Sequence, residues 1–248
     1  MPATGPLRQV ARVKQAVCAI GFTDAPPEKF VQDARASSFE VVGSGFLIES
    51  RLVMTCAHVL TELTSWMGKK RLPETAAYLQ FIIPRGGGGW EVTYRHFDVM
   101  GANPKLDIAS VRARSAPAAR HDPPPVSVIK ASDQIEVGEE IGLVGFPHGS
   151  ALLGKKRSLI RFGPLFQRGS VSALTPYDGN TPNEILLDLI TAGAASGSPI
   201  FRIATGEVIG VLARGQEQRQ ATTSIAIPVV DTGRGIAVPF GEPKPRGT

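Results

Sequence analysis

Residues 43–60 read GSGFLIESRLVMTCAHVL and are the most informative part of the chain. Two apolar runs flank the polar triplet Glu-Ser-Arg, and this alternation predicts β-strands over Phe39–Glu49 and Leu52–Thr55. His58 follows the second strand after two small residues. An apolar strand that ends in Thr-x-Ala-His can also place a buried structural histidine, so the meaning of His58 depends on the rest of the chain.

The sequence around this stretch predicts an all-β protein. Short runs rich in β-branched and aromatic residues alternate with clusters of Gly, Pro, Asn and Asp, and long segments with a helical period are missing. Many short strands at regular spacing are typical of a barrel or a sandwich. One short helix is expected over Thr61–Lys69. The further predicted strands cover Ala16–Phe22, Ala77–Pro84, Glu91–Phe97, Ile108–Arg112, Glu140–Gly145, Gly169–Leu174, Ile185–Leu189, Pro199–Arg202, Val208–Ala213 and Thr223–Ile227.

Composition and charge indicate an ordinary globular protein, for which no cofactor is expected. The 248 residues are 42% hydrophobic and 20% charged, enough for one large all-β domain or two small packed lobes. The net charge is +5, but no basic patch is interleaved with aromatic residues, so no nucleic-acid partner is expected. Two cysteines cannot make the disulfide framework of small secreted domains. No run approaches the roughly 18 apolar residues of a membrane span and no signal-peptide core is seen. We therefore expect no membrane partner and a cytoplasmic location.

A proline-rich stretch divides the chain. Residues 114–127, RSAPAARHDPPPVS, resist both helix and sheet interiors and predict a linker between two halves. The expected organisation is an N-terminal arm at 1–13, a folded domain at 14–230 with halves at about 14–115 and 126–230, and a C-terminal tail at 231–248.

Three separated segments carry residues that could cooperate in nucleophilic catalysis. They are 43–60, which contains His58, LDIASVRA at 106–113 with Asp107, and ITAGAASGSPIF at 190–201 with Ser196. A serine hydroxyl keeps its proton at neutral pH unless a histidine within hydrogen-bond reach removes it. A carboxylate then fixes the tautomer of that histidine and stabilises the imidazolium. Each segment alone is a weak signal, and the order His, Asp, Ser is the informative part.

These segments resemble the trypsin-like, chymotrypsin-fold serine protease family, in particular its bacterial branch related to the high-temperature-requirement proteases. The resemblance implies two six-stranded antiparallel β-barrels with the active site in the cleft between them. It also implies a catalytic triad of His58 as base, Asp107 as orienting acid and Ser196 as nucleophile. The motifs that carry it are GSGFLI, TCAH, LDIA and SGSPIF, with GLVGFP at 142–147, Gly169–Ser172, GEVIGV at 206–211 and SIAIP at 224–228. We expect no PDZ-like segment after these motifs. We also expect no metal ligand set, because no Cys/His spacing supports one.

The turn before the nucleophile departs from the family pattern. The family implies an oxyanion hole made by the backbone N–H groups of Ala194 and Ser196, with glycine usual at the first place. Such turns often require a positive φ, which costs alanine roughly 1–2 kcal/mol. We therefore expect the peptide between Gly193 and Ala194 to be flipped in the free protein, with the hole partly collapsed.

The resemblance also implies a substrate pocket for small or medium apolar side chains. Its expected members are Ile190 at the floor and Leu212, Ala213, Arg214 and Gly215 along one wall. No acid stands at the floor to pair with a Lys or Arg substrate. The expected partners are protein or peptide substrates, and the oligomeric state is left open. The alternative to a serine endopeptidase is a catalytically impaired relative that uses the scaffold for binding, which only Ala194 favours.

Overall fold

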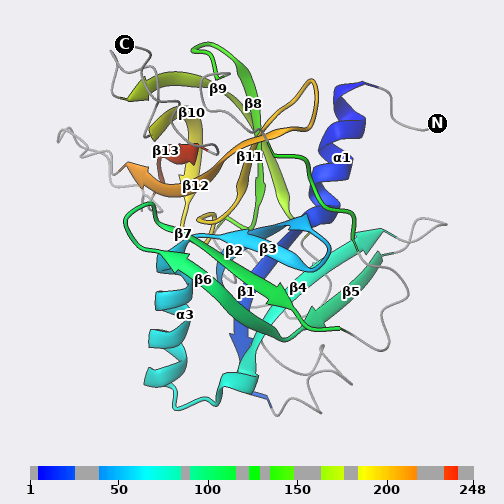
Figure 1. The fold of residues 1–248 in the computed structure, drawn as a ribbon, viewed down its shortest axis with the longest axis vertical. Coiled ribbons are helices and arrows are strands. Elements are labelled where there is room, and N and C mark those ends of the chain that lie inside the picture. The colour runs from blue at the N-terminus through cyan, green and yellow to red at the C-terminus, as the bar shows by residue number, and fades with distance from the viewer. Residues whose placement is uncertain are drawn as a thin grey trace, which may run out of the picture.

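The computed structural model describes residues 5–25, 39–84, 90–115, 123–128, 135–147, 163–175, 184–216 and 232–239. Within these residues the protein consists of two antiparallel β-sheets, two α-helices and one short 3-10 helix, η1 (Glu74–Ala76) (Figure 1). The N-terminal sheet occupies the lower half of Figure 1 and the C-terminal barrel the upper half. The predicted all-β double-barrel fold is confirmed.

The N-terminal sheet curls because one bent stretch of chain forms both of its edge strands. The sheet order is β5-β4-β1-β2-β3-β7-β6, yet β5 and β6 are separated in sequence by His96 alone. The His96 carbonyl accepts from Arg114 N (2.8 Å), beyond the end of β7, while its Nδ1 lies 3.3 Å from the carbonyl of Ala77 in β4. Counting β5 and β6 as one bent strand gives the six strands that the sequence predicts. The strands are β1 (Val17–Thr23), β2 (Phe39–Glu49), β3 (Leu52–Thr55), β4 (Ala77–Pro84), β5 (Trp90–Arg95), β6 (Phe97–Asn103) and β7 (Ile108–Ala113).

The C-terminal sheet is a closed six-stranded barrel with the order β10-β13-β12-β11-β8-β9. Closure leaves no free sheet edge, which would otherwise expose unpaired backbone groups. The strands are β8 (Glu140–Gly145), β9 (Leu165–Thr175), β10 (Glu184–Ala192), β11 (Pro199–Arg202), β12 (Val208–Gln216) and β13 (Thr232–Pro239).

The prediction of a tail at 231–248 is wrong over β13. This strand pairs with β10 and β12 and closes the barrel, with Ile236 opposite both Leu186 and Arg214. The sequence contains two similar runs, SIAIP at 224–228 and GIAVP at 235–239, and the second one forms the strand. Local pattern does not distinguish them, because the choice depends on pairing with distant strands. The predicted strand Thr223–Ile227 lies outside the described residues.

The N-terminal arm is a packed helix. Helix α1 (Pro6–Ala16) buries Val10, Val13 and Ala16 in the same apolar cluster as the N-terminal barrel. That cluster also includes Phe146 and Phe201 of the C-terminal half, so a shared apolar core joins the two barrels. Burial of this shared apolar surface stabilises the packing of the two barrels against each other.

The proline-rich connection is likewise held against both barrels where it is described. Val126 N donates to Leu47 O in β2 (2.9 Å), and Val208 N in β12 donates to Ser127 O (2.8 Å).

None of the helices in the described part of the chain is long and apolar enough to cross a membrane.

Candidate active site

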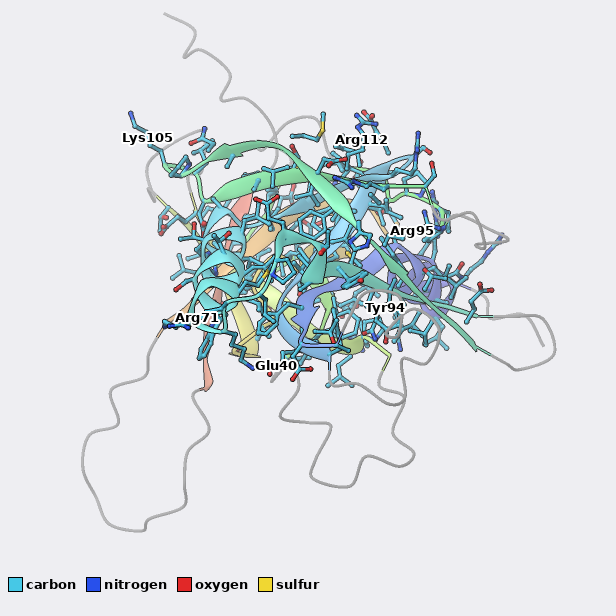
Figure 2. The ribbon with its side chains drawn as sticks, turned by 90° about the horizontal axis from the view of Figure 1, so that it is seen from below. Glu40, Arg71, Tyr94, Arg95, Lys105 and Arg112 are labelled. Atoms are coloured by element: carbon cyan, nitrogen blue, oxygen red, sulfur yellow. The ribbon has the colours of Figure 1, made fainter. Side chains whose placement is uncertain are left out.

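His58 lies in the first turn of helix α3 (Ala57–Lys69), and Asp107 lies in the turn between β6 and β7. The Asn103 side-chain oxygen accepts from the backbone N–H groups of Lys105 and Leu106 (3.1 and 3.2 Å) and shapes this turn. Asp107 has a φ of 52°, in the left-handed region that Asp tolerates better than most residues. Strands β6 and β7 and this turn form a hairpin, and Figure 2 shows its residues Lys105 and Arg112 near the outer edge of the molecule.

The Asp107 carboxylate contacts His58 twice. Oδ1 accepts from the His58 backbone N–H (2.9 Å), and Oδ2 lies 2.6 Å from His58 Nδ1. The Asp107 carbonyl also accepts from Ala57 N (3.2 Å). Helix N-termini carry N–H groups without helical partners, and Cys56 at the N-cap provides no side-chain hydrogen bond. Asp107 therefore accepts hydrogen bonds from the first two backbone N–H groups of α3, and its carboxylate also orients the His58 ring.

This arrangement leaves the other ring nitrogen available. A carboxylate accepts hydrogen bonds, so Nδ1 of a neutral His58 ring donates to Asp107 and Nε2 carries the lone pair. The side chains are 36% exposed for His58 and 30% exposed for Asp107, so an external molecule can reach the ring.

Ser196 lies on the turn between β10 and β11. Its Oγ donates to the carbonyl of Ala213 in β12 (3.2 Å), and within the described residues no hydrogen bond joins this hydroxyl to His58. The Ser196 and His58 segments meet at the Leu212 carbonyl, which accepts from Gly197 N (2.8 Å) and from Cys56 Sγ (3.1 Å). The structure thus places the three sequence-predicted residues on adjoining segments. Two of them, His58 and Asp107, are joined by hydrogen bonds.

The nucleophile turn has its carbonyls occupied. Ala194 O accepts from Ser44 Oγ (2.9 Å), Ala195 O accepts from Ser198 N (3.1 Å), and Ser196 O accepts from Ser44 N (2.8 Å). In the part of the chain that the structure describes, the N–H groups of Ala194 and Ser196 donate to no acceptor. Both groups are therefore free to donate to an oxygen from outside the chain.

Ala194 already has a φ of 66°, the left-handed value that the turn was predicted to require. A flipped Gly193–Ala194 peptide would turn the Gly193 carbonyl toward Ser196 N, and the described residues contain no such bond. The turn is thus in the open arrangement rather than the collapsed one that we expected.

Comparison with known sequences identifies the family. The family described as trypsin-like peptidase domain matches residues 43–211, more than half of the chain. The chain belongs to this family. No curated protein matches the sequence significantly.

Solved structures share the fold of this trypsin-like domain. The HtrA-type protease AlgW, solved with a tripeptide, is 18% identical with a TM-score of 0.53, and the match covers 95% of this chain and 60% of AlgW. Deg5 is 16% identical with a TM-score of 0.56, and the match covers 94% of this chain and 87% of Deg5. The chain thus spans less than two thirds of the AlgW chain, and these identities indicate a common fold alone.

Cys56 is a neutral thiol beside the His58–Asp107 pair of the trypsin-like domain. Burial, and secondarily the negative charge of Asp107, raise its pKa above the ordinary range. Cys56, His58 and Asp107 place possible metal ligands within 4.8 Å of one another. The thiol donates to Leu212 O and the carboxylate oxygens accept from His58, so these groups bond to the protein itself.

The residues predicted to line the substrate pocket fall on two strands of the C-terminal barrel. Leu212 and Ala213 are buried in β12 beside the nucleophile turn. Ile190 lies in β10, and β13 runs between these strands: Arg234 pairs with Ile190 on one side and with Gln216 on the other. The strands that carry the predicted pocket residues are therefore separated in the sheet by β13, which the sequence analysis assigns to the tail. The side chains of Ile190, Arg214 and Gly215 lie outside what the structure describes.

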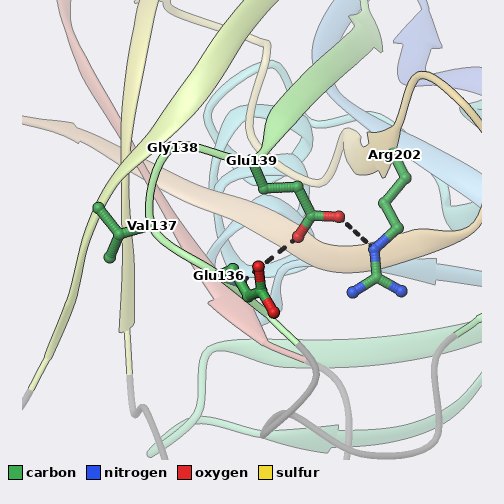
Figure 3. Close-up of a pocket in the computed structure, with 5 residues that line it drawn as sticks. All are labelled: Glu136, Val137, Gly138, Glu139 and Arg202. Atoms are coloured by element: carbon green, nitrogen blue, oxygen red, sulfur yellow. Dashed lines mark hydrogen bonds and ion pairs between the residues drawn. The ribbon is translucent and has the colours of Figure 1, made fainter.

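A separate hollow on the C-terminal barrel is lined by Glu136, Val137, Gly138, Glu139 and Arg202 (Figure 3). Arg202 Nε donates to Glu139, and its Nη1 donates to Glu207 (2.8 Å). Arg202 thus pairs with two carboxylates. None of the lining residues belongs to the three segments described above.

Proposed function

We propose that this trypsin-like domain is a serine endopeptidase that cleaves peptide bonds through an acyl-enzyme. His58 is the general base, Asp107 the orienting acid and Ser196 the nucleophile. The observation that carries the proposal is the double contact of Asp107 with His58, because it presents Nε2 as the acceptor that a serine nucleophile requires.

Acylation begins when Ser196 Oγ exchanges its bond to Ala213 O for one to His58 Nε2. His58 takes the hydroxyl proton as Oγ attacks the carbonyl carbon of the substrate, and the imidazolium is stabilised by Asp107. The N–H groups of Ala194 and Ser196 donate to the oxyanion of the tetrahedral intermediate. His58 then gives its proton to the leaving amine, the C–N bond breaks, and an ester to Ser196 remains.

Deacylation repeats the sequence with water as nucleophile. His58 removes a proton from water, which attacks the ester carbonyl, and the same two N–H groups stabilise the second oxyanion. The proton returns to Ser196 Oγ, and the carboxylic acid product leaves. No group from outside the chain other than substrate and water is required.

The substrates are proteins or peptides with a small or medium apolar side chain before the cleaved bond. This preference follows from Ile190 at the expected floor and from the absence of an acid among the expected pocket residues. A peptide library in which cleavage occurs strictly after Lys or Arg would contradict it.

A second candidate is a binding scaffold without turnover. Two observations favour it: Ala194 replaces the usual glycine, and Ser196 Oγ bonds to Ala213 O rather than to His58. The free N–H groups of the turn favour the enzyme.

A fluorophosphonate probe, which reacts only with an activated serine, separates the two candidates. Wild-type protein should be labelled and should cleave a fluorogenic peptide, whereas Ser196→Ala should do neither. His58→Ala should lose nearly all of both reactions with an unchanged melting profile. An unlabelled but folded wild-type protein would establish the scaffold instead.

A further inference from the structure

Ser44 uses all of its polar groups to join four segments around the nucleophile turn. It lies in β2, and its exposed fraction is 0%. Its Oγ donates to Ala194 O (2.9 Å) and accepts from Phe146 N (3.1 Å). Its N–H donates to Ser196 O (2.8 Å), and its carbonyl accepts from Thr55 Oγ1 (2.7 Å). A serine between two glycines of an apolar strand thus contacts both barrels.

Two glycines make room for these contacts. A Cβ on Gly197, which has a φ of 86°, would lie 2.0 Å from Ser44 O. A Cβ on Gly145 would lie 1.9 Å from Ser198 Oγ and 3.2 Å from Ser44 Oγ. The nucleophile turn can therefore approach Ser44 closely only because Gly197 lacks a side chain, and Gly145 leaves room for Ser198 and Ser44 beside β8.

The contacts of Ser44 limit how the turn can move. Ser44 donates to the carbonyls of Ala194 and Ser196, and Ser198 N donates to that of Ala195. Three successive peptide units are therefore held. The peptide between Gly193 and Ala194 is the remaining unit, and its N–H is one of the two proposed oxyanion donors. Its rotation requires Ala194 to leave its φ of 66°.

We infer that Ser44 is a positioning residue that keeps Ala194 in the left-handed conformation and so holds the oxyanion hole open. The left-handed region disfavours alanine by about five- to thirtyfold. One buried hydrogen bond shifts an equilibrium by about two- to twelvefold, which is the size needed to offset a large part of that preference. The Ser44 hydroxyl therefore stabilises a left-handed conformation that a glycine at position 194 would adopt without a steric cost.

A double-mutant cycle of Ser44→Ala and Ala194→Gly tests this inference, which rests on the proposed peptidase function. The readouts are kcat and KM on a fluorogenic peptide with an apolar residue before the cleaved bond. Ser44→Ala alone should lower kcat about tenfold and change KM less than about twofold, because the loss falls on the transition state. In the Ala194→Gly background the same change should cost less than about threefold, since glycine adopts the left-handed conformation freely.

The cycle separates the inference from the function on which it rests. Wild-type protein without activity refutes the proposed function. Active wild type with an unchanged Ser44→Ala variant overturns the inference, as does an equal loss of kcat in both backgrounds, which would reflect general damage to the fold.

Ser44→Ala also removes the acceptor of the buried Phe146 N–H and can prevent folding. In that case Ser44→Cys is used in the same cycle, because a thiol fills the space and is a weaker donor. The inference then requires that Ser44→Cys lower kcat and that Ala194→Gly reduce this loss, and an additive result overturns it.

Discussion

Replacing Asp107 by asparagine should abolish most peptidase activity while leaving the fold intact, and the structure specifies why. The His58 backbone N–H donates to Oδ1 at 2.9 Å, so an asparagine must keep its carbonyl oxygen on that side. Its amide NH₂ then faces the ring, where Oδ2 now lies 2.6 Å from Nδ1. Two donors cannot face one another, so Nδ1 becomes the acceptor and the ring proton moves to Nε2.

A ring with its proton on Nε2 cannot remove the proton of Ser196. In a Ser-His-Asp triad this tautomer change lowers kcat by about 10⁴ without moving the side chains, equivalent to about 5.4 kcal/mol of activation free energy. The stability cost should be small by comparison. Only the negative charge at the N-terminus of α3 is lost, which is worth about 0.3–1 kcal/mol, or a few degrees at most in Tm.

The assay compares Asp107→Asn with Asp98→Asn on a fluorogenic peptide and in a thermal melt. Asp98 is the matched control, because it lies on the same hairpin and its carboxylate pairs with Arg114 at the exposed surface. The guanidinium of Arg114 lowers the pKa of Asp98, so the control also removes a charge at neutral pH. A folded Asp107→Asn variant with kcat within about tenfold of wild type would refute the tautomer argument.

Three further changes have definite outcomes. Gly197→Ala should destabilise the fold by about 3 kcal/mol, measured by urea unfolding, because its Cβ would lie 2.0 Å from Ser44 O and its φ is 86°; an unchanged midpoint contradicts the close approach. Burial raises the pKa of the Cys18 and Cys56 thiols, so the folded state keeps these protons while unfolded thiols ionise near about 8.5. Stability should therefore fall above about pH 8.5 by about 1.4 kcal/mol per pH unit per thiol, and a variant with both cysteines replaced by alanine should lack that part of the slope. Ile190→Asp should shift cleavage in a peptide library toward Lys and Arg, and an unchanged preference would remove Ile190 from the pocket floor.

Strands with clear boundaries could be predicted from the sequence residue by residue. Phe39–Glu49, Leu52–Thr55, Glu140–Gly145 and Pro199–Arg202 form with the predicted bounds, because each apolar run is flanked by polar or turn-forming residues. The predicted strand Glu91–Phe97 instead spans a bend at His96, where one strand passes to the next. The bend exists because the barrel closes there, which no local pattern records.

The helix after His58 shows a similar limit. The sequence predicts Thr61–Lys69, and the helix begins at Ala57. A helix start is normally read from a capping side chain, but Cys56 provides none, and the acceptor is Asp107 from the β6–β7 turn. The early start and the orientation of His58 thus have one cause, which is a contact between segments far apart in the sequence.

Ala194 shows how a departure from a family pattern depends on its partners. The sequence correctly indicates a backbone that favours glycine, and the structure gives Ala194 a φ of 66°. From the alanine alone, a flipped peptide was the physical expectation, since nothing nearby in sequence offsets the cost. The hydroxyl that contacts Ala194 O comes from Ser44, 150 residues away. The same motif that carries the family resemblance, GSGFLI, therefore contains the residue that we infer keeps Ala194 in this conformation. A substitution at either position has to be interpreted together with the residue at the other.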